Sequence, residues 1–119
     1  MTTTPSPTDT GSDLIALAER CEAATGPDIV LTQDIADYAE SAGLISIAML
    51  VPDYTASIDA ALTLVPGPDW EWSLEWETGS DGQMFARCAL GDPMRFCDCE
   101  APTLALAICA AALRARAAQ

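Results

Sequence analysis

The chain has 119 residues, with 18 acidic residues against 5 basic ones and a formal net charge of −13. All five basic residues are arginine, and the absence of lysine and histidine excludes His-containing zinc sites, Ser-His or Cys-His nucleophile pairs, and P-loop or Schiff-base chemistry. The acidity also argues against direct binding of nucleic acid, because neutralising phosphates requires a basic patch.

The N-terminal part predicts a tail followed by a helix. Residues Met1–Gly11 are rich in Thr and Pro, and we expect them to form a disordered tail before a single domain at residues 12–119. Ser12 is the expected N-cap of the first helix, and apolar residues then recur at three- and four-residue spacing. Gly26-Pro27 ends this helix.

Two further helices are expected before the first strand. Asp28–Ala42 has apolar residues on one face and carboxylates outside it. Leu44–Val51 is a short apolar run for which periodicity allows either a buried strand or a packed loop. Thr55 is the expected N-cap of a third helix at Ala56–Val65, which Pro66-Gly67-Pro68 terminates.

The clearest period-two pattern in the chain begins at Trp70. Apolar residues alternate with glutamate and serine as far as Glu77, which predicts an antiparallel strand with one buried face. The alternative is a stacking platform for bases or sugars. Because the alanine-rich helices need a partner, we interpret the tryptophans as a core aromatic stripe: Trp70, Trp72 and Trp76.

A second strand at Met84–Leu90 should return along the first. The loop Ser80-Asp81-Gly82 places glycine in the left-handed position that three-residue hairpins require. The hydrophobic faces then fix a register that pairs Trp76 with Ala86, Leu74 with Cys88 and Trp72 with Leu90. The same register sets Glu75 opposite Arg87 on the outer face. Met94–Cys99 is a candidate third strand.

The last helix should begin at Pro102 or Thr103 and run to about Ala117. The predicted fold class is therefore α+β: a small antiparallel sheet of two to three strands, its tryptophan face packed against helices, in the order ααα-ββ(β)-α. Half of the residues are apolar and 22 are alanine, which favours a helix-rich globular domain. No apolar stretch is long enough to span a membrane, and no signal peptide is recognisable. We expect a soluble, cytoplasmic protein.

Charged residues of the predicted sheet form a candidate interaction surface: Glu71, Glu75, Glu77, Arg87 and Arg95. The glutamates could form a solvated face, act as an acid/base pair, or imitate the phosphates of DNA. The arginines could hold an anionic ligand, but pairing with neighbouring glutamates is the simpler interpretation.

Cys97-Asp98-Cys99 places two thiols on one side of a strand, with Cys88 nearby in the sequence. Metal binding and redox chemistry are both conceivable, but a C-x-C pair without histidine is a poor match to a metal site. We interpret these residues as small apolar side chains, and we expect no metal site, no cofactor and no catalytic residues.

Several segments resemble a group of small phage and prophage proteins that carry a phage ABA sandwich domain. The most specific is Tyr54–Pro66; the others are Ala23–Asp28, Trp70–Trp72, Ala101–Leu106 and Leu113–Ala117. The resemblance implies a bacteriophage origin and an α/β layered domain, and it brings no catalytic residues.

The sequence thus predicts a small acidic phage-encoded binding protein without catalytic activity. Its partner would be a host or phage protein, in the cytoplasm of the bacterial host. The alternatives are an acidic inhibitor of a host DNA-binding defence enzyme, a small-molecule-sequestering protein with a pocket between sheet and helices, and a minor virion component.

Overall fold

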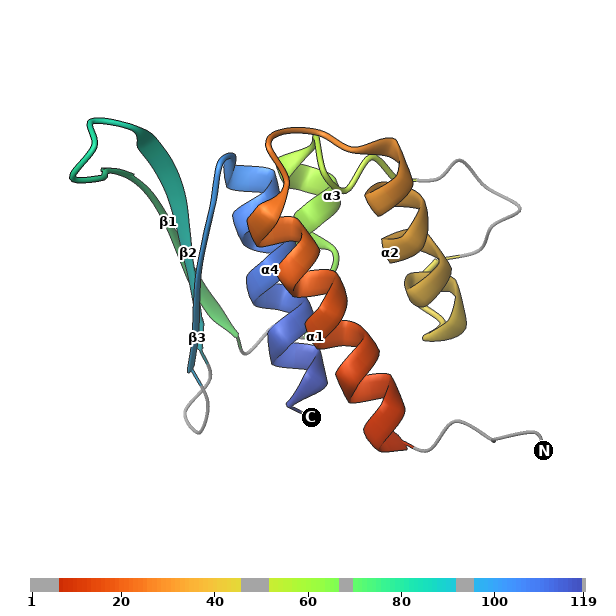
Figure 1. Cartoon of the computed structure of the whole chain (residues 1–119). Coiled ribbons are helices and arrows are strands. Elements are labelled where there is room, and N and C mark those ends of the chain that lie inside the picture. The colour runs from red at the N-terminus through yellow and green to blue at the C-terminus, as the bar shows by residue number, and fades with distance from the viewer. Residues whose placement is uncertain (1–6, 46–51, 67–69, 92–95, 119) are drawn as a thin grey trace.

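The computed structural model of the chain describes residues 7–45, 52–66, 70–91 and 96–118 (Figure 1). Helices and an antiparallel sheet follow one another in the predicted order, so the α+β fold class is confirmed. The elements are α1 (Pro7–Ala23), α2 (Ile29–Ser41), α3 (Ile58–Leu62), β1 (Glu71–Thr78), β2 (Met84–Gly91), β3 (Phe96–Ala101) and α4 (Leu104–Ala117).

Helix α4 is the centre of the molecule. It lies between the sheet and the other helices, with α1 beside it and α2 and α3 farther from the sheet (Figure 1). Every residue from Ala105 to Leu113 is buried. The high alanine content explains this, because small side chains let a strand, α1 and α3 approach the helix closely from different sides. Among the described residues, no helix covers the opposite face of the sheet.

The first helix is longer than predicted. It begins at Pro7, so residues 7–11 of the expected disordered tail are helical and Ser12 is not the N-cap; residues 1–6 lie outside the described residues. Proline suits a first helical turn, whose N–H groups have no intrahelical partner. A Cβ on Gly11 would lie 3.6 Å from the carbonyl oxygen of Ala117. The early turn therefore lies beside the C-terminal end of α4, a contact that the local pattern did not reveal.

Thr55 does not cap the third helix. Ser57 is the N-cap of α3, which is shorter than predicted. The hydroxyl of Thr55 instead accepts the backbone N–H of Asp28 at 2.9 Å and lies 2.7 Å from the hydroxyl of Thr32. This buried network joins the start of α2 to the turn before α3. The predicted second helix is confirmed with Asp28 as its N-cap, whereas residues 46–51 of the apolar run lie outside the described residues.

The predicted hairpin register is confirmed at each pair. Trp76 lies opposite Ala86, Leu74 opposite Cys88, and Trp72 opposite Leu90. Gly82 has a φ of 84°, as the three-residue loop requires. The third strand is present and runs to Ala101, two residues beyond its predicted end, with Cys99 opposite Cys88; residues 94–95 of the predicted strand lie outside the described residues.

The sheet packs against helices as expected, but the prediction that all three tryptophans belong to the core is wrong. Trp70 is buried, whereas Trp72 and Trp76 are each 49% exposed. They share the helix-facing side of the sheet with buried Cys88, as the alternation predicts. A helix is about 10 Å wide and neighbouring strands are about 4.8 Å apart, so one helix covers about two strands. Helix α4 covers β2 and β3 and leaves the edge strand β1 largely open.

This difference among the tryptophans is measurable by fluorescence. In a variant that keeps only Trp70 (Trp72→Phe with Trp76→Phe), we expect blue-shifted emission and weak quenching by acrylamide. A variant that keeps only Trp72 (Trp70→Phe with Trp76→Phe) should emit at longer wavelength and quench several-fold more steeply. Equal quenching of the two variants would contradict the burial described here.

Candidate functional site

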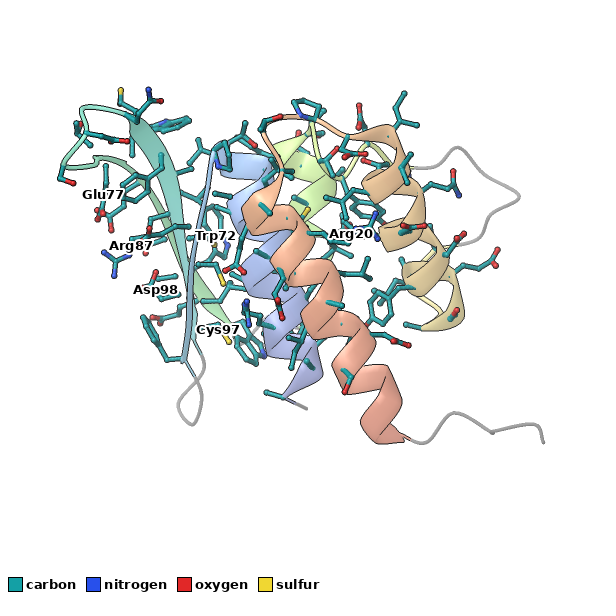
Figure 2. The ribbon with its side chains drawn as sticks, viewed as in Figure 1. Arg20, Trp72, Glu77, Arg87, Cys97 and Asp98 are labelled. Atoms are coloured by element: carbon teal, nitrogen blue, oxygen red, sulfur yellow. The ribbon has the colours of Figure 1, made fainter. Side chains whose placement is uncertain are left out.

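The uncovered face of the sheet carries most of the predicted interaction surface. Strand alternation places five carboxylates and one guanidinium on this outer face: Glu71, Glu75, Glu77, Asp98, Glu100 and Arg87. Figure 2 shows Glu77, Arg87 and Asp98 on the side away from the helices, and Trp72 and Cys97 on the helix side. We call this set of six charged residues the acidic face.

Arg87 is the centre of the acidic face and is fully engaged. Its Nε donates to Asp98 Oδ1 at 2.8 Å, its Nη2 also pairs with Asp98, and its Nη1 donates to Glu77 Oε1 at 3.0 Å. Glu75 lies directly opposite Arg87, as predicted, but the ion pair runs diagonally to Glu77 instead. The interpretation that Arg87 pairs with a neighbouring glutamate holds for Glu77, whereas its second partner, Asp98, was not predicted. Arg95 lies outside the described residues.

The hydrogen bond from Arg87 holds the pKa of Asp98 below its ordinary value. A depressed carboxyl pKa means that the pair stabilises the sheet at neutral pH and is lost as the pH falls through the lowered pKa. Among the described residues, Glu71, Glu75 and Glu100 form no ion pair. Within the part of the chain that the structure describes, these three exposed carboxylates therefore have no cationic partner.

No described arginine is available for an anionic ligand. The three besides Arg87 also have partners: Arg20 with Asp34, Arg114 with Glu22, and Arg116 with the carbonyl oxygens of Leu64 and Val65. For Arg114, the hydrogen bond to Glu22 raises the guanidinium pKa. The described part of the chain thus favours a surface that attracts cations.

An apolar strip lies on the helix-facing side of β1, opposite the acidic face. Trp72 and Trp76 belong to it, together with Met84, which lies opposite Thr78 and is 62% exposed. Leu74 lies between the two tryptophans and is half-buried. Exposed aromatic and methionine side chains are enriched at protein interfaces and costly to leave in water. We call Trp72, Leu74, Trp76 and Met84 the tryptophan edge.

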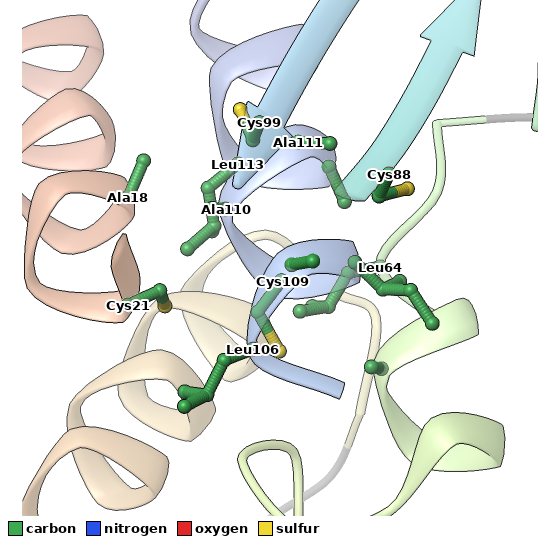
Figure 3. Close-up of a cluster of buried hydrophobic side chains, with 14 of the residues drawn as sticks. Ala18, Cys21, Leu64, Cys88, Cys99, Leu106, Cys109, Ala110, Ala111 and Leu113 are labelled. Atoms are coloured by element: carbon green, nitrogen blue, oxygen red, sulfur yellow. The ribbon is translucent and has the colours of Figure 1, made fainter. Parts of the chain in front are cut away.

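The cysteines lie in the packed interior. Cys88 and Cys99 are opposite each other and buried, Cys21 and Cys109 are buried between helices, and Cys97 is half-buried (Figure 3 shows the four buried thiols). All five are free thiols. Among the described residues, no three Cys, Asp or Glu side chains lie where they could hold a metal ion.

Burial makes these thiols poor nucleophiles. Desolvation raises the pKa of Cys88 and of Cys99 to about 12, and it also raises the pKa of Cys97. For Cys109, a hydrogen bond with the thiol of Cys21 raises the pKa first, and burial adds to it. Since the thiolate is the reactive form, none of these four is activated at neutral pH.

We expect Cys97 to be the first thiol modified in the native protein. With a thiol-disulfide reagent such as DTNB, it should react alone and slowly, and the other four should react only after unfolding in guanidinium. Because its pKa is raised, its rate should still climb above pH 9, where an ordinary thiol levels off. Cys97→Ser should abolish the native phase. Two or more fast thiols in that variant would contradict this assignment.

The structure has an open groove on its helical side. A hollow of about 540 Å³ lies between α1 and α2, lined in part by Leu14, Leu17 and Tyr38. The Arg20–Asp34 ion pair belongs to its wall, with a distance of 2.7 Å. Buried side chains of the core lie between the sheet and the helices.

The predicted interaction surface lacks two members of the acidic face, Asp98 and Glu100. The alternation of side chains along a strand could have identified them, because Cys97 and Cys99 are predicted to share one side of the strand. Asp98 and Glu100 must then lie on the opposite side of that strand.

The charge of −13 predicts a salt-dependent stability. We expect the melting temperature to rise between about 10 mM and about 150 mM NaCl, as the screening length falls from about 30 Å to about 8 Å and like-charge repulsion weakens. Differential scanning calorimetry at pH 7 measures this directly. A melting temperature that falls with added salt would contradict it.

Comparison with known proteins adds no relative. No family model, no curated protein and no solved structure matches the chain. Within the described residues, no helix is long and apolar enough to cross a membrane.

Proposed function

We propose that the chain is a non-enzymatic binding protein whose acidic face takes a basic surface of another protein. One observation carries the proposal: Arg87, the only described cation of that face, forms ion pairs with Asp98 and Glu77. Glu71, Glu75 and Glu100 have no ion-pair partner among the described residues. Complementary charge accelerates encounter and selects the partner.

The non-enzymatic part is supported by the state of the reactive groups. The described thiols are buried or half-buried, and four of them have raised pKa values, with burial a cause in each. The carboxylates of the acidic face are exposed or half-buried, whereas general acid/base catalysis needs a proton-transfer group held beside the substrate. Turnover of any compound by the purified protein in a metabolite screen would refute this part.

The binding part is tested by affinity capture from cells that express the protein. Wild type is compared with a Glu71→Gln, Glu75→Gln, Glu100→Gln variant, and bound proteins are identified by mass spectrometry. We expect a basic protein on the wild type at low salt, absent from the variant and released by about 1 M salt, which screens charge beyond about 3 Å. Equal capture by the variant would overturn the role of the acidic face. A matched control is Glu19→Gln, which removes one exposed carboxylate from α1.

The phage origin is a hypothesis that rests on the sequence resemblance, and the host or phage partner is part of it. Inhibition of a DNA-binding defence enzyme is the form of the proposal in which the acidic face replaces DNA. It predicts that the captured protein binds DNA and that a DNA duplex competes with the wild-type chain. A captured protein that DNA does not displace would exclude this form while leaving the binding function intact.

A further inference from the structure

Strand β1 combines three features that meet nowhere else among the described residues: a sheet edge, an apolar strip and a row of carboxylates. It pairs with β2 in an unbroken one-to-one register from Glu71 to Thr78. In the described part of the chain, no strand pairs with its other side. That side therefore presents backbone N–H and C=O groups in a regular extended array.

Native proteins usually block such an edge with charged side chains, a proline, a bulge, a short strand or a covering element. Strand β1 is eight residues long and contains neither a bulge nor a proline, so its three glutamates are the device that would repel an acidic or identical strand. The other edge, β3, is shorter and is covered on its inner face by α4 and α1. The exposed edge and the half-exposed Trp72 and Trp76 thus coincide on β1.

We propose that β1 binds an extended segment of the partner protein by strand addition, and that this segment alternates apolar and basic residues. This inference rests on the proposed binding function and specifies its site. The added strand would place apolar side chains over the tryptophan edge, which α4 is too narrow to cover. Its alternate side chains would face Glu71, Glu75 and Glu77, where Lys or Arg satisfies the charge.

A second copy of this chain does not fit the same edge. An antiparallel pair with Leu74 on the two-fold axis would bring Trp72 opposite Trp76, as the apolar faces require. It would also set Glu71 of each copy opposite Glu77 of the other, and like charges directly opposite are destabilising. The chain has no lysine to relieve this repulsion. Charge complementarity therefore selects a basic partner strand over self-association.

The test uses the full ¹⁵N-labelled chain and a capped octapeptide of alternating Lys and Val. Two control peptides are an octapeptide of the same composition with the four Lys grouped before the four Val, and an alternating Glu-Val octapeptide. NMR titration gives affinity, and hydrogen exchange reports which backbone amides become protected. We expect the Lys-Val peptide to protect β1 amides that point away from β2, and both controls to leave them unprotected.

Variants separate the two faces of the strand. Trp72→Ala should weaken binding of the Lys-Val peptide at least about tenfold, as for a buried aromatic anchor. Glu75→Gln should weaken it about two- to fivefold, as for one cross-strand charge pair. Phe96→Ala, which removes an exposed aromatic from the outer face of β3, should change nothing. An unchanged affinity for Trp72→Ala would overturn the proposal.

The experiments distinguish failure of the strand-addition proposal from failure of the proposed binding function. Peptide binding that depends on Glu75 but protects no β1 amide would overturn strand addition and leave the acidic face as the binding surface. Strand addition would also be overturned if the peptide does not bind while the wild type still captures a basic protein that the glutamine variant loses. The acidic face would again remain as the binding surface. If neither peptide nor basic protein binds, both proposals fail.

Discussion

Ile108→Ala is expected to lower the free energy of unfolding by about 2–5 kcal/mol. Ile108 is completely buried in α4, the helix that the sheet and the other helices share as their packing partner. Truncation removes apolar contacts and leaves a cavity that surrounding backbone can only partly close. Urea unfolding followed by circular dichroism should show a lower midpoint with an unchanged slope.

The matched control is Ile15→Ala in α1. The same atoms are removed from a helix, but Ile15 is 40% exposed and no enclosed cavity forms. We expect a cost of less than about 1 kcal/mol, because the smaller loss of burial is offset in part by the better helix propensity of alanine. Equal costs at the two positions would show that α4 is not the centre of the core.

Ala18→Leu is expected to destabilise the protein by about 1–3 kcal/mol through overpacking. Ala18 is fully buried on α1, which packs against α4, and it belongs to the same core cluster as Ala110 of α4 (Figure 3). A larger side chain must push the two helices apart or adopt a strained rotamer. Thermal unfolding and urea unfolding both measure the loss.

Ala16→Leu provides the control on the same helix. Ala16 is exposed, so leucine there enters no packed interface and has a similar helix propensity. We expect a change within about 0.5 kcal/mol. If Ala18→Leu were as mild as Ala16→Leu, the close approach of α1 and α4 would be wrong.

Strand pairing was predictable because its determinants are local. The alternation from Trp70 to Glu77 identifies the strand, and Gly82 sets the loop. Together they allow only one register in which apolar faces coincide. The same alternation places the charged residues of β1 and β2 on one face. Applied to β3, it also places Asp98 and Glu100 on that face.

Helix ends were less predictable because they depend on distant contacts. Thr55 has the chemistry of an N-cap, but its hydroxyl is occupied by Asp28 and Thr32, and Ser57 caps α3 instead. The N-terminal turns of α1 look like a Thr/Pro-rich tail, yet Gly11 lies against the end of α4. A local sequence pattern does not reveal contacts with residues that are distant in the chain.

By itself, the sequence determined the order of elements, the hairpin register and the acidic face, since each follows from the alternation of side chains along a strand and from turn chemistry. Only the tertiary structure decided which part of the sheet's inner face is covered. That depends on the width and lateral position of α4, which spans β2 and β3 and stops short of β1. Trp70 is consequently core, whereas Trp72 and Trp76 form an exposed edge.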